Sequence, residues 1–346
     1  MNLNLGGFIA ACALAAIEIA HPQCASAHTG AAPVGIKLVE ETDSATGRRY
    51  ALAIFYPAAL DARANNPTFK MPFFINVQLY TNAPLAAGRR LPLVMFSHGR
   101  GSNPLYYAWF AQNLAAHGYI VAGIYHYHAN TYDSTIAYLA NKLWQRPVDL
   151  TTSITLLLKD PNWGPRIDAH RIGVAGHSQG GFTSLWLGGA TVNRDKYLAF
   201  QRGWKRNASI PASLRAQLPL DPTPALHVRD PRVKAVFSMA PGVLQAFGMD
   251  AAGLRNLTTP AYITVGAGDT VTPPKDNAVF AARYARHAEL HVIPGRAGHN
   301  VFVNECDRDG KDELPEACLD EPGVDRAAIH REVGRAALDF FSAHLK

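Results

Sequence analysis

A serine occupies the centre of a Gly-x-Ser-x-Gly motif within residues 171–181, whose sequence is RIGVAGHSQGG. The apolar residues before Gly176 predict a buried strand, and the apolar segment after Gly181 predicts a helix. A sharp turn between strand and helix exposes such a serine as a nucleophile, and its glycines let the two elements pass closely. We therefore predict that Ser178 is a nucleophile; an ordinary glycine-rich turn is the alternative.

Two residues farther along the chain suit the base and the orienting acid that a nucleophilic serine needs. Asp269 follows a predicted strand at 260–265, and His299 follows a predicted strand at 290–293. In an open α/β sheet, reacting groups gather beyond the carboxyl ends of the strands. We expect Asp269 and His299 to complete a triad with Ser178; a loop-capping aspartate and a surface histidine are the alternatives.

A further predicted strand at 93–97 leads into the sequence HGRG at 98–101. We expect an oxyanion hole formed by two backbone N–H groups, one from Arg100 and one from Gln179, the residue after the serine. One such donor typically lowers the barrier by about 3 kcal/mol, so this loop matters nearly as much as the triad. A plain strand-to-helix turn is the alternative.

Three histidines stand near the same predicted sheet edge. His126 and His128 belong to the sequence YHYH at 125–128, and His98 begins the loop before Arg100. Two histidines that are two positions apart can ligate a metal, but the surrounding sequence offers no obvious further ligands. We expect these histidines to bind substrate as a polar wall of its pocket, and we expect no metal; a plain loop is the alternative.

Four segments of the chain together resemble a known family. They are FSHGRG at 96–101, LAAHGYIVA at 114–122, RIGVAGHSQGG at 171–181 and CLDEPGVDR at 318–326. These segments resemble the predicted dienelactone-hydrolase-like group of the α/β-hydrolases, which is related to the platelet-activating-factor acetylhydrolases. The resemblance runs from about Gly35 to the end of the sequence.

The resemblance implies a serine hydrolase of ester bonds that uses no metal and no organic cofactor. It assigns the triad to Ser178, Asp269 and His299, and their order along the chain is that of α/β-hydrolases. One difference bears on the substrate. True dienelactone hydrolases use a cysteine nucleophile, whereas this motif carries a serine, so a lactone substrate does not follow.

The first 27 residues predict a secretory signal peptide. An apolar stretch at 5–20 is short for a membrane span, and Ala25-Ser26-Ala27 matches an A-x-A cleavage site. The segment lacks the usual leading Lys or Arg, and residues 9–12 faintly resemble a lipoprotein box. We expect a periplasmic or secreted protein of residues 28–346, without an integral membrane segment.

Cysteine use agrees with that compartment. Of four cysteines, Cys12 and Cys24 would leave with the signal peptide, and the remaining pair, Cys306 and Cys318, predicts a disulfide. The acidic stretch at 307–313 between them contains oxygen ligands and a glycine, but it lacks the twelve-residue spacing of a calcium loop. A solvated loop held by the disulfide is the main expectation, and a calcium site is the alternative.

The remaining sequence predicts strands that alternate with helices. Strands are expected at 36–41, 49–56 and 120–125, helices at 107–116, 148–158 and 326–345, and an irregular excursion at 57–90. This alternation predicts one α/β domain with a mostly parallel central sheet and helices on both faces. The pattern breaks at about 191–232, where we expect a small cap; a surface insertion that never touches substrate is the alternative.

These observations predict a serine carboxylic-ester hydrolase that works through an acyl-enzyme on Ser178. A lipase or phospholipase A2-like enzyme would use the same machinery on an aggregated lipid. A non-catalytic binding protein on the same scaffold is a less favoured alternative. The formal net charge is +6, yet no basic run with interleaved aromatics favours nucleic acid, so the expected partner is a small-molecule or lipid ester. The sequence leaves the oligomeric state open.

Overall fold

The computed structural model describes residues 31–60, 67–134, 142–208, 211–216 and 226–346. The compact unit described below is Ala31–Lys346. The predicted signal peptide at 1–27 lies outside the described residues and stays a prediction. Among the helices of the described segments, none is long and apolar enough to cross a membrane.

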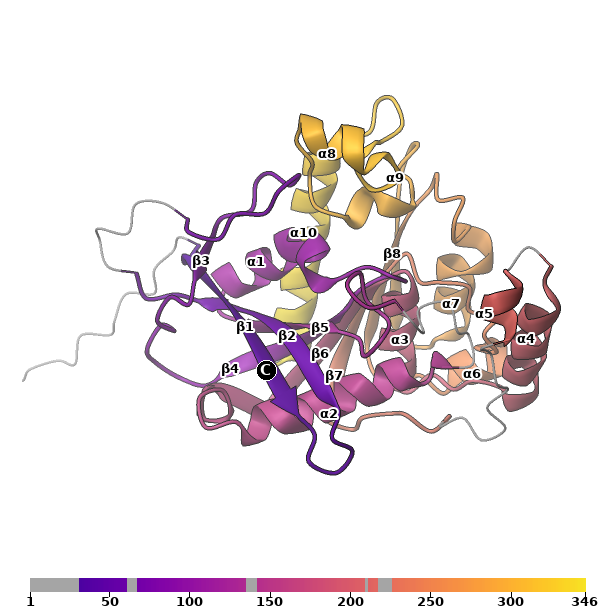
Figure 1. Ribbon diagram of the computed structural model, residues 1–346, viewed down its shortest axis with the longest axis horizontal. Helices are drawn as coiled ribbons and strands as arrows, with labels where there is room; N and C mark the ends of the chain where they lie inside the picture. The colour runs from indigo at the N-terminus through magenta and orange to yellow at the C-terminus, as the bar shows by residue number, and fades with distance from the viewer. Residues whose placement is uncertain (1–30, 61–66, 135–141, 209–210, 217–225) are drawn as a thin grey trace, which may run out of the picture. The chain divides into compact units, whose positions relative to one another are not determined.

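A nine-stranded sheet, in the order β3-β1-β2-β5-β4-β6-β7-β8-β9, forms the centre of this unit (Figure 1). From β5 to β9 every neighbouring pair is parallel, whereas β2 is antiparallel to both β1 and β5. The strands are β1 (Val34–Thr42), β2 (Arg49–Pro57), β3 (Leu79–Thr81), β4 (Leu91–Ser97), β5 (Ile120–Tyr125), β6 (Ile167–His177), β7 (Val233–Met239), β8 (Ala261–Gly266) and β9 (Ala288–Ile293).

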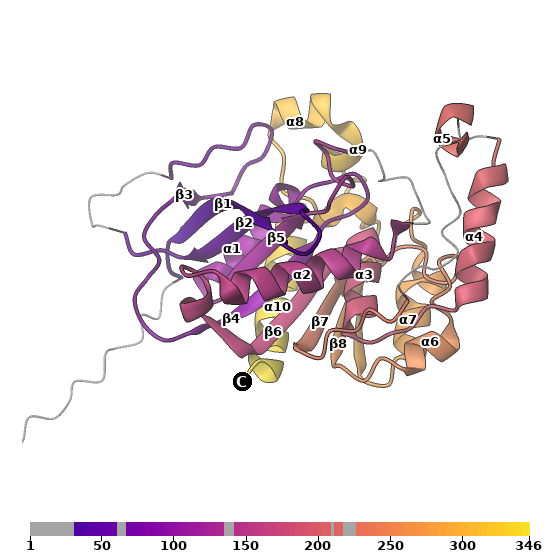
Figure 2. The same ribbon diagram turned by 60° about the horizontal axis from the view of Figure 1, so that its bottom comes forward.

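Helices cover both faces of the sheet, as the sequence predicts. Helices α1 and α10 pack together on one face, and α2 and α3 cover the other (Figures 1 and 2). The helices are α1 (Ala108–Ala116), α2 (Gln145–Lys159), α3 (Gln179–Gly188), α4 (Arg194–Arg206), α5 (Ala212–Ala216), α6 (Ala251–Arg255), α7 (Ala278–Tyr284), α8 (Arg308–Glu313), α9 (Pro315–Cys318) and α10 (Arg326–His344). The described segments also contain the 3₁₀ turns η1 (Pro104–Tyr107), η3 (Gly164–Arg166), η4 (Pro274–Asp276) and η5 (His299–Phe302).

The two-sided cover explains the strand sequences. Strand β4 is nearly continuously apolar, and Leu93, Val94 and Met95 have no exposed surface even though successive side chains point to opposite faces. On the α10 face, Gly173 of β6 lies so close to Phe341 that an added β-carbon would be 2.7 Å from its ring. The parallel strands therefore align their carboxyl ends at one edge of a tightly packed sheet.

Three details differ from the sequence-based expectations. The excursion at 57–90 contains the short strand β3, and strand β7 was not predicted, although it lies between β6 and β8. The acidic stretch at 307–313 forms the helix α8, which Asp307 caps by accepting a 2.7 Å hydrogen bond from the Gly310 N–H.

In the expected cap at 191–232 the structure describes α4 and α5, and 209–210 and 217–225 lie outside the described residues.

Candidate active site

Ser178 lies at the turn between β6 and α3 in a backbone conformation that side chains rarely adopt, with φ 57° and ψ −119°. Backbone hydrogen bonds to the segment after β7 hold it there. Its N–H donates to the Met239 carbonyl at 2.9 Å, and its own carbonyl accepts from the Gly242 N–H at 2.8 Å. A strained residue that its surroundings hold in place is typical of a functional position.

A chain of hydrogen bonds joins Ser178, His299 and Asp269. The Oγ of Ser178 lies 2.9 Å from Nε2 of His299, and Nδ1 of His299 lies 2.7 Å from Oδ2 of Asp269. Asp269 follows β8, and His299 begins η5 after β9, as the sequence predicts. Both residues are buried, and the exposed fraction of His299 is 9%. The structure thus brings the three predicted triad residues together.

The surroundings of Asp269 favour its ionised form. Oδ1 accepts hydrogen bonds from the N–H groups of Val271 and Thr272 at 2.9 and 2.8 Å, and Oδ2 accepts from the Thr272 hydroxyl at 2.8 Å. Burial alone would raise the pKa of Asp269, but these bonds and the interaction with His299 outweigh it and lower the pKa. An ionised Asp269 accepts the Nδ1 proton of His299, which leaves Nε2 free to take the proton of Ser178.

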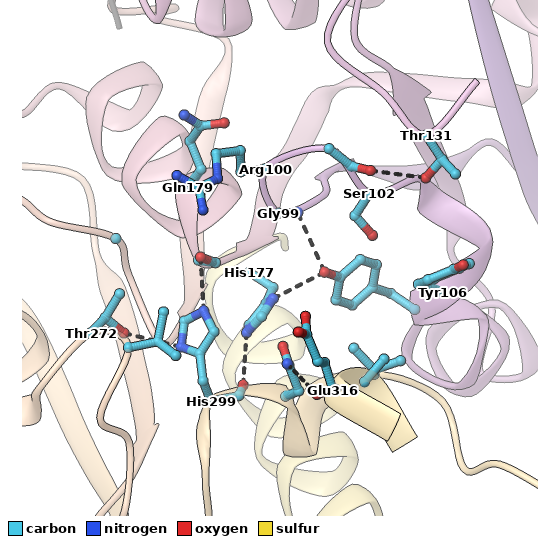
Figure 3. Close-up of a pocket in the computed structure, with 18 of the residues that line it drawn as sticks. Gly99, Arg100, Ser102, Tyr106, Thr131, His177, Gln179, Thr272, His299 and Glu316 are labelled. Carbon is cyan, nitrogen blue, oxygen red and sulfur yellow. Dashed lines mark hydrogen bonds between the residues drawn. The ribbon is translucent and has the colours of Figure 1, made fainter. Parts of the chain in front are cut away.

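Ser178 opens into a pocket of about 620 Å³, shown in Figure 3. Both residues of the predicted oxyanion hole, Arg100 and Gln179, line it with Ser178. Gln179 is the first residue of α3, so its N–H has no acceptor within the helix and lies at the positive end of the helix dipole. The arrangement can activate a hydroxyl and stabilise negative charge on a bound oxygen.

Part of the chain is similar to a known family. Residues 73–143 match the family model described as "Platelet-activating factor acetylhydrolase, isoform II". The dog platelet-activating factor acetylhydrolase is 29% identical over 147 residues, which cover 30% of this chain and 33% of that protein. The guinea-pig protein of the same name is 37% identical over 76 residues, covering 20% and 17% of the two chains. The match thus spans a third or less of these relatives.

Two solved structures resemble almost the whole chain. A ferulic acid esterase from Streptomyces cinnamoneus superposes with a TM-score of 0.63 at 20% identity, covering 92% of each chain. A putative dienelactone hydrolase from Klebsiella pneumoniae superposes with a TM-score of 0.52 at 15% identity, covering 89% of this chain and 99% of the other. This chain has the α/β-hydrolase fold. The expected fold class is confirmed.

The hydrolase fold does not bring the three predicted substrate-binding histidines to this pocket. His98 and His126 have no exposed surface, and neither lines it. His128 lines a different hollow beside Asp133. Burial, reinforced by the nearby charge of Arg146, holds the pKa values of His98 and His126 well below the usual range. These two histidines are neutral parts of the interior, and the expectation of a polar pocket wall does not match their positions.

Arg146, which the sequence analysis did not single out, ties together the two sides of the predicted oxyanion hole. Its Nη2 donates to the Ser97 hydroxyl at 3.2 Å and to the His98 carbonyl, just before the loop that carries Arg100. Its Nε donates to the Thr183 hydroxyl at 3.3 Å, and that hydroxyl donates to the Gln179 carbonyl at 2.8 Å. The arginine side chain thus contacts both segments, and the local sequence carries no signal of these contacts.

Tyr107 and His177 also line the pocket and were not assigned a role from the sequence. His177 occupies the position before the serine in the Gly-x-Ser-x-Gly motif, where an aromatic ring with two hydrogen-bonding nitrogens is the available signal. Its ring lies beside that of His299, with 4.7 Å between the centroids.

The predicted disulfide between Cys306 and Cys318 is present, with 5.6 Å between their α-carbons. The bond joins Cys306, which precedes α8, to Cys318 at the end of α9. Helix α9 lies beside His299, because the neighbouring Asn300 donates a 2.7 Å hydrogen bond to the carbonyl of Glu316, and Glu316 lines the pocket. Among the described residues, no group of three or more His, Cys, Asp or Glu side chains suits a metal ion, at 307–313 or elsewhere.

Proposed function

We propose that this protein is a serine carboxylic-ester hydrolase that acts through an acyl-enzyme on Ser178. The observation that carries the proposal is the hydrogen-bonded chain from Ser178 through His299 to the buried Asp269, at the wall of a pocket. The similarity to proteins named as acetylhydrolases, an esterase and a dienelactone hydrolase supports ester chemistry.

The roles follow from the contacts. Ser178 Oγ attacks the ester carbonyl while its proton passes to Nε2 of His299, and Asp269 stabilises the resulting imidazolium. The N–H groups of Arg100 and Gln179 bind the oxyanion. Collapse of this intermediate breaks the bond to the alcohol oxygen, which takes the proton from His299. A water molecule, deprotonated by His299, then attacks the acyl carbonyl and releases the acid and Ser178.

A lipid ester is the second candidate substrate, because the pocket wall continues as apolar surface. Val243 and Val271 line the pocket and are 38% and 60% exposed. Such a rim suits an acyl chain that enters from an aggregate. A lipase or phospholipase A2-like specificity would follow.

The insertion at 191–232 supports this pocket indirectly. None of its described residues lines the pocket, but Phe200 of α4 packs edge-on against Phe247 with ring centroids 4.7 Å apart, and Phe247 lines it. The insertion therefore acts as a cap that shapes the pocket through Phe247.

The domain spans residues 28–346 after a signal peptide at 1–27, and the protein is periplasmic or secreted. The Cys306–Cys318 disulfide supports that compartment.

The test is turnover of p-nitrophenyl esters of rising chain length, presented as soluble molecules and in micelles, together with labelling by a fluorophosphonate. Ser178→Ala is expected to lower kcat by about a million-fold and to abolish labelling. Ser342→Ala, at an exposed serine of α10, is the matched control and should leave both unchanged. An alanine variant at 178 that keeps more than about a hundredth of the rate would exclude the mechanism. A preference for micelles would select the lipid substrate.

A further inference from the structure

Tyr107 and His177 form a buried connection between three parts of the site, and the mechanism above gives neither of them a role. The exposed fraction of each is 2%. Tyr107 Oη lies 3.3 Å from the N–H of Gly99 and 3.0 Å from Nδ1 of His177. His177 Nε2 lies 3.0 Å from the carbonyl oxygen of His299, as a dashed line in Figure 3 shows.

The direction of each hydrogen bond follows from the groups involved. The carbonyl of His299 can only accept, so Nε2 of His177 carries the proton. Burial, with His299 nearby, holds the pKa of His177 well below the usual range, so the ring is neutral and Nδ1 accepts. The Tyr107 hydroxyl therefore donates to Nδ1 of His177, and its oxygen accepts the Gly99 N–H. One placement of the protons therefore satisfies all three hydrogen bonds.

The ends of this connection lie next to the reacting groups. Gly99 precedes Arg100 in the loop at 98–101, which we call the oxyanion loop, and His177 precedes Ser178. The third end is the backbone of the base, His299. Between them the packing is close, because a β-carbon at Gly99 would be 3.2 Å from Tyr107 Oη and 3.5 Å from Nδ1 of His177.

We propose that Tyr107 and His177 are positioning residues that hold the oxyanion loop and the base at fixed distances from Ser178. This inference rests on the proposed function. Neither side chain exchanges a proton with substrate; each acts through the backbone of Gly99 or His299. A misplacement of reacting groups by about 1 Å can cost about a hundred-fold in rate, so the loss should appear in kcat and leave KM nearly unchanged.

The experiment compares kcat, KM and the melting temperature for four variants on one soluble ester, with active sites counted by fluorophosphonate at completion. Tyr107→Phe removes only the hydroxyl. His177→Phe removes both ring nitrogens, whereas His177→Gln retains an N–H that can reach the His299 carbonyl. Tyr119→Phe is the matched control, because Tyr119 is a buried tyrosine just before the amino end of β5, away from the pocket.

We expect kcat to fall about ten-fold in Tyr107→Phe and about a hundred-fold in His177→Phe, with KM changed less than about two-fold. His177→Gln should recover at least about ten-fold of that loss although its melting temperature stays below that of the unmodified protein. Tyr119→Phe should keep its kcat.

The inference would be overturned if kcat were unchanged in Tyr107→Phe and His177→Phe. It would also be overturned if His177→Phe and His177→Gln lost kcat equally and in proportion to their lower melting temperatures. Either result would leave the two residues a purely structural role. Because Tyr107→Phe preserves the shape of the side chain, its kcat tests the inference even if His177→Phe fails to fold. If the unmodified protein neither turns over esters nor reacts with the fluorophosphonate, the proposed function fails instead.

Discussion

The α-carbon of Gly180 lies directly against the backbone carbonyl of Ser97, so that a β-carbon at position 180 would come within 1.8 Å of the carbonyl oxygen. This contact lets the first turn of α3 begin beside the end of β4. It therefore brings the N–H of Gln179 to the same pocket as the loop that carries Arg100. The second glycine of the Gly-x-Ser-x-Gly motif thus serves the predicted oxyanion hole as well as the turn.

Gly180→Ala is expected to lower the free energy of unfolding by about 3 kcal/mol or more, because the overlap is with backbone and no side-chain rotation relieves it. Denaturant unfolding measures the change. Gly203→Ala is the matched control: Gly203 lies within α4 with nothing within 4 Å of the added carbon, so the variant should gain up to about 1 kcal/mol. Equal stability of the two variants would contradict this account.

Asp269→Asn is expected to lower kcat by about ten-thousand-fold. The amide oxygen can keep the bonds to the Val271 and Thr272 N–H groups, but the NH₂ group would then face Nδ1 of His299. The imidazole proton would move to Nε2, and a protonated Nε2 cannot accept the proton of Ser178. Steady-state kinetics at neutral pH measures the loss. Asp276→Asn, at an exposed residue of η4, should change kcat little, and the opposite ranking would assign the acid elsewhere.

Replacing Cys306 and Cys318 together by serine should lower the free energy of unfolding by about 3 kcal/mol, because the open loop has more freedom in the unfolded chain. The rate should fall as well, since this segment contacts Asn300, the residue after the base. Thermal melts and kinetics with and without reductant check both effects. Two titratable thiols in protein denatured without reductant would show that the bond does not form.

Asp149 of α2 should make stability depend on pH. It is 1% exposed, and burial, opposed by the charges of Arg48 and Arg146, raises its pKa to about 7 from 3.8. The folded state then holds this proton more tightly than the unfolded state, so stability is lost as pH rises from about 4 to about 7, by up to about 1.4 kcal/mol per pH unit.

Asp149→Asn removes this titration. The variant and the unmodified protein should unfold with similar free energies near pH 4.5, and the variant should become relatively more stable by pH 7.5. Denaturant unfolding at both pH values measures the difference. Parallel pH profiles would mean that Asp149 is ionised throughout the range.

The local sequence determined the strand, the turn and the helix around Ser178, because apolar runs and glycine spacing act over a few residues. It also predicted that Asp269 and His299 each follow a strand, as they do in the structure. Parallel strands align their carboxyl ends at one edge, so a residue just after such a strand lies at that edge whatever its distance along the chain. The prediction that Cys306 pairs with Cys318 needed only that two cysteines remain once the predicted signal peptide is set aside.

Only the tertiary structure decided which residues at that edge face the pocket. His98 and His126 follow strands as Asp269 does, yet both are fully buried, where Arg146 of α2 hydrogen-bonds the His98 carbonyl and Asp149 of α2 lies 3.2 Å from Nδ1 of His126. Tyr107 and His177 face the pocket because segments about 70 and 120 residues apart along the chain hydrogen-bond there. Whether a polar side chain is enclosed or open to a ligand depends on what packs over it, and those neighbours come from distant parts of the chain that no local pattern records.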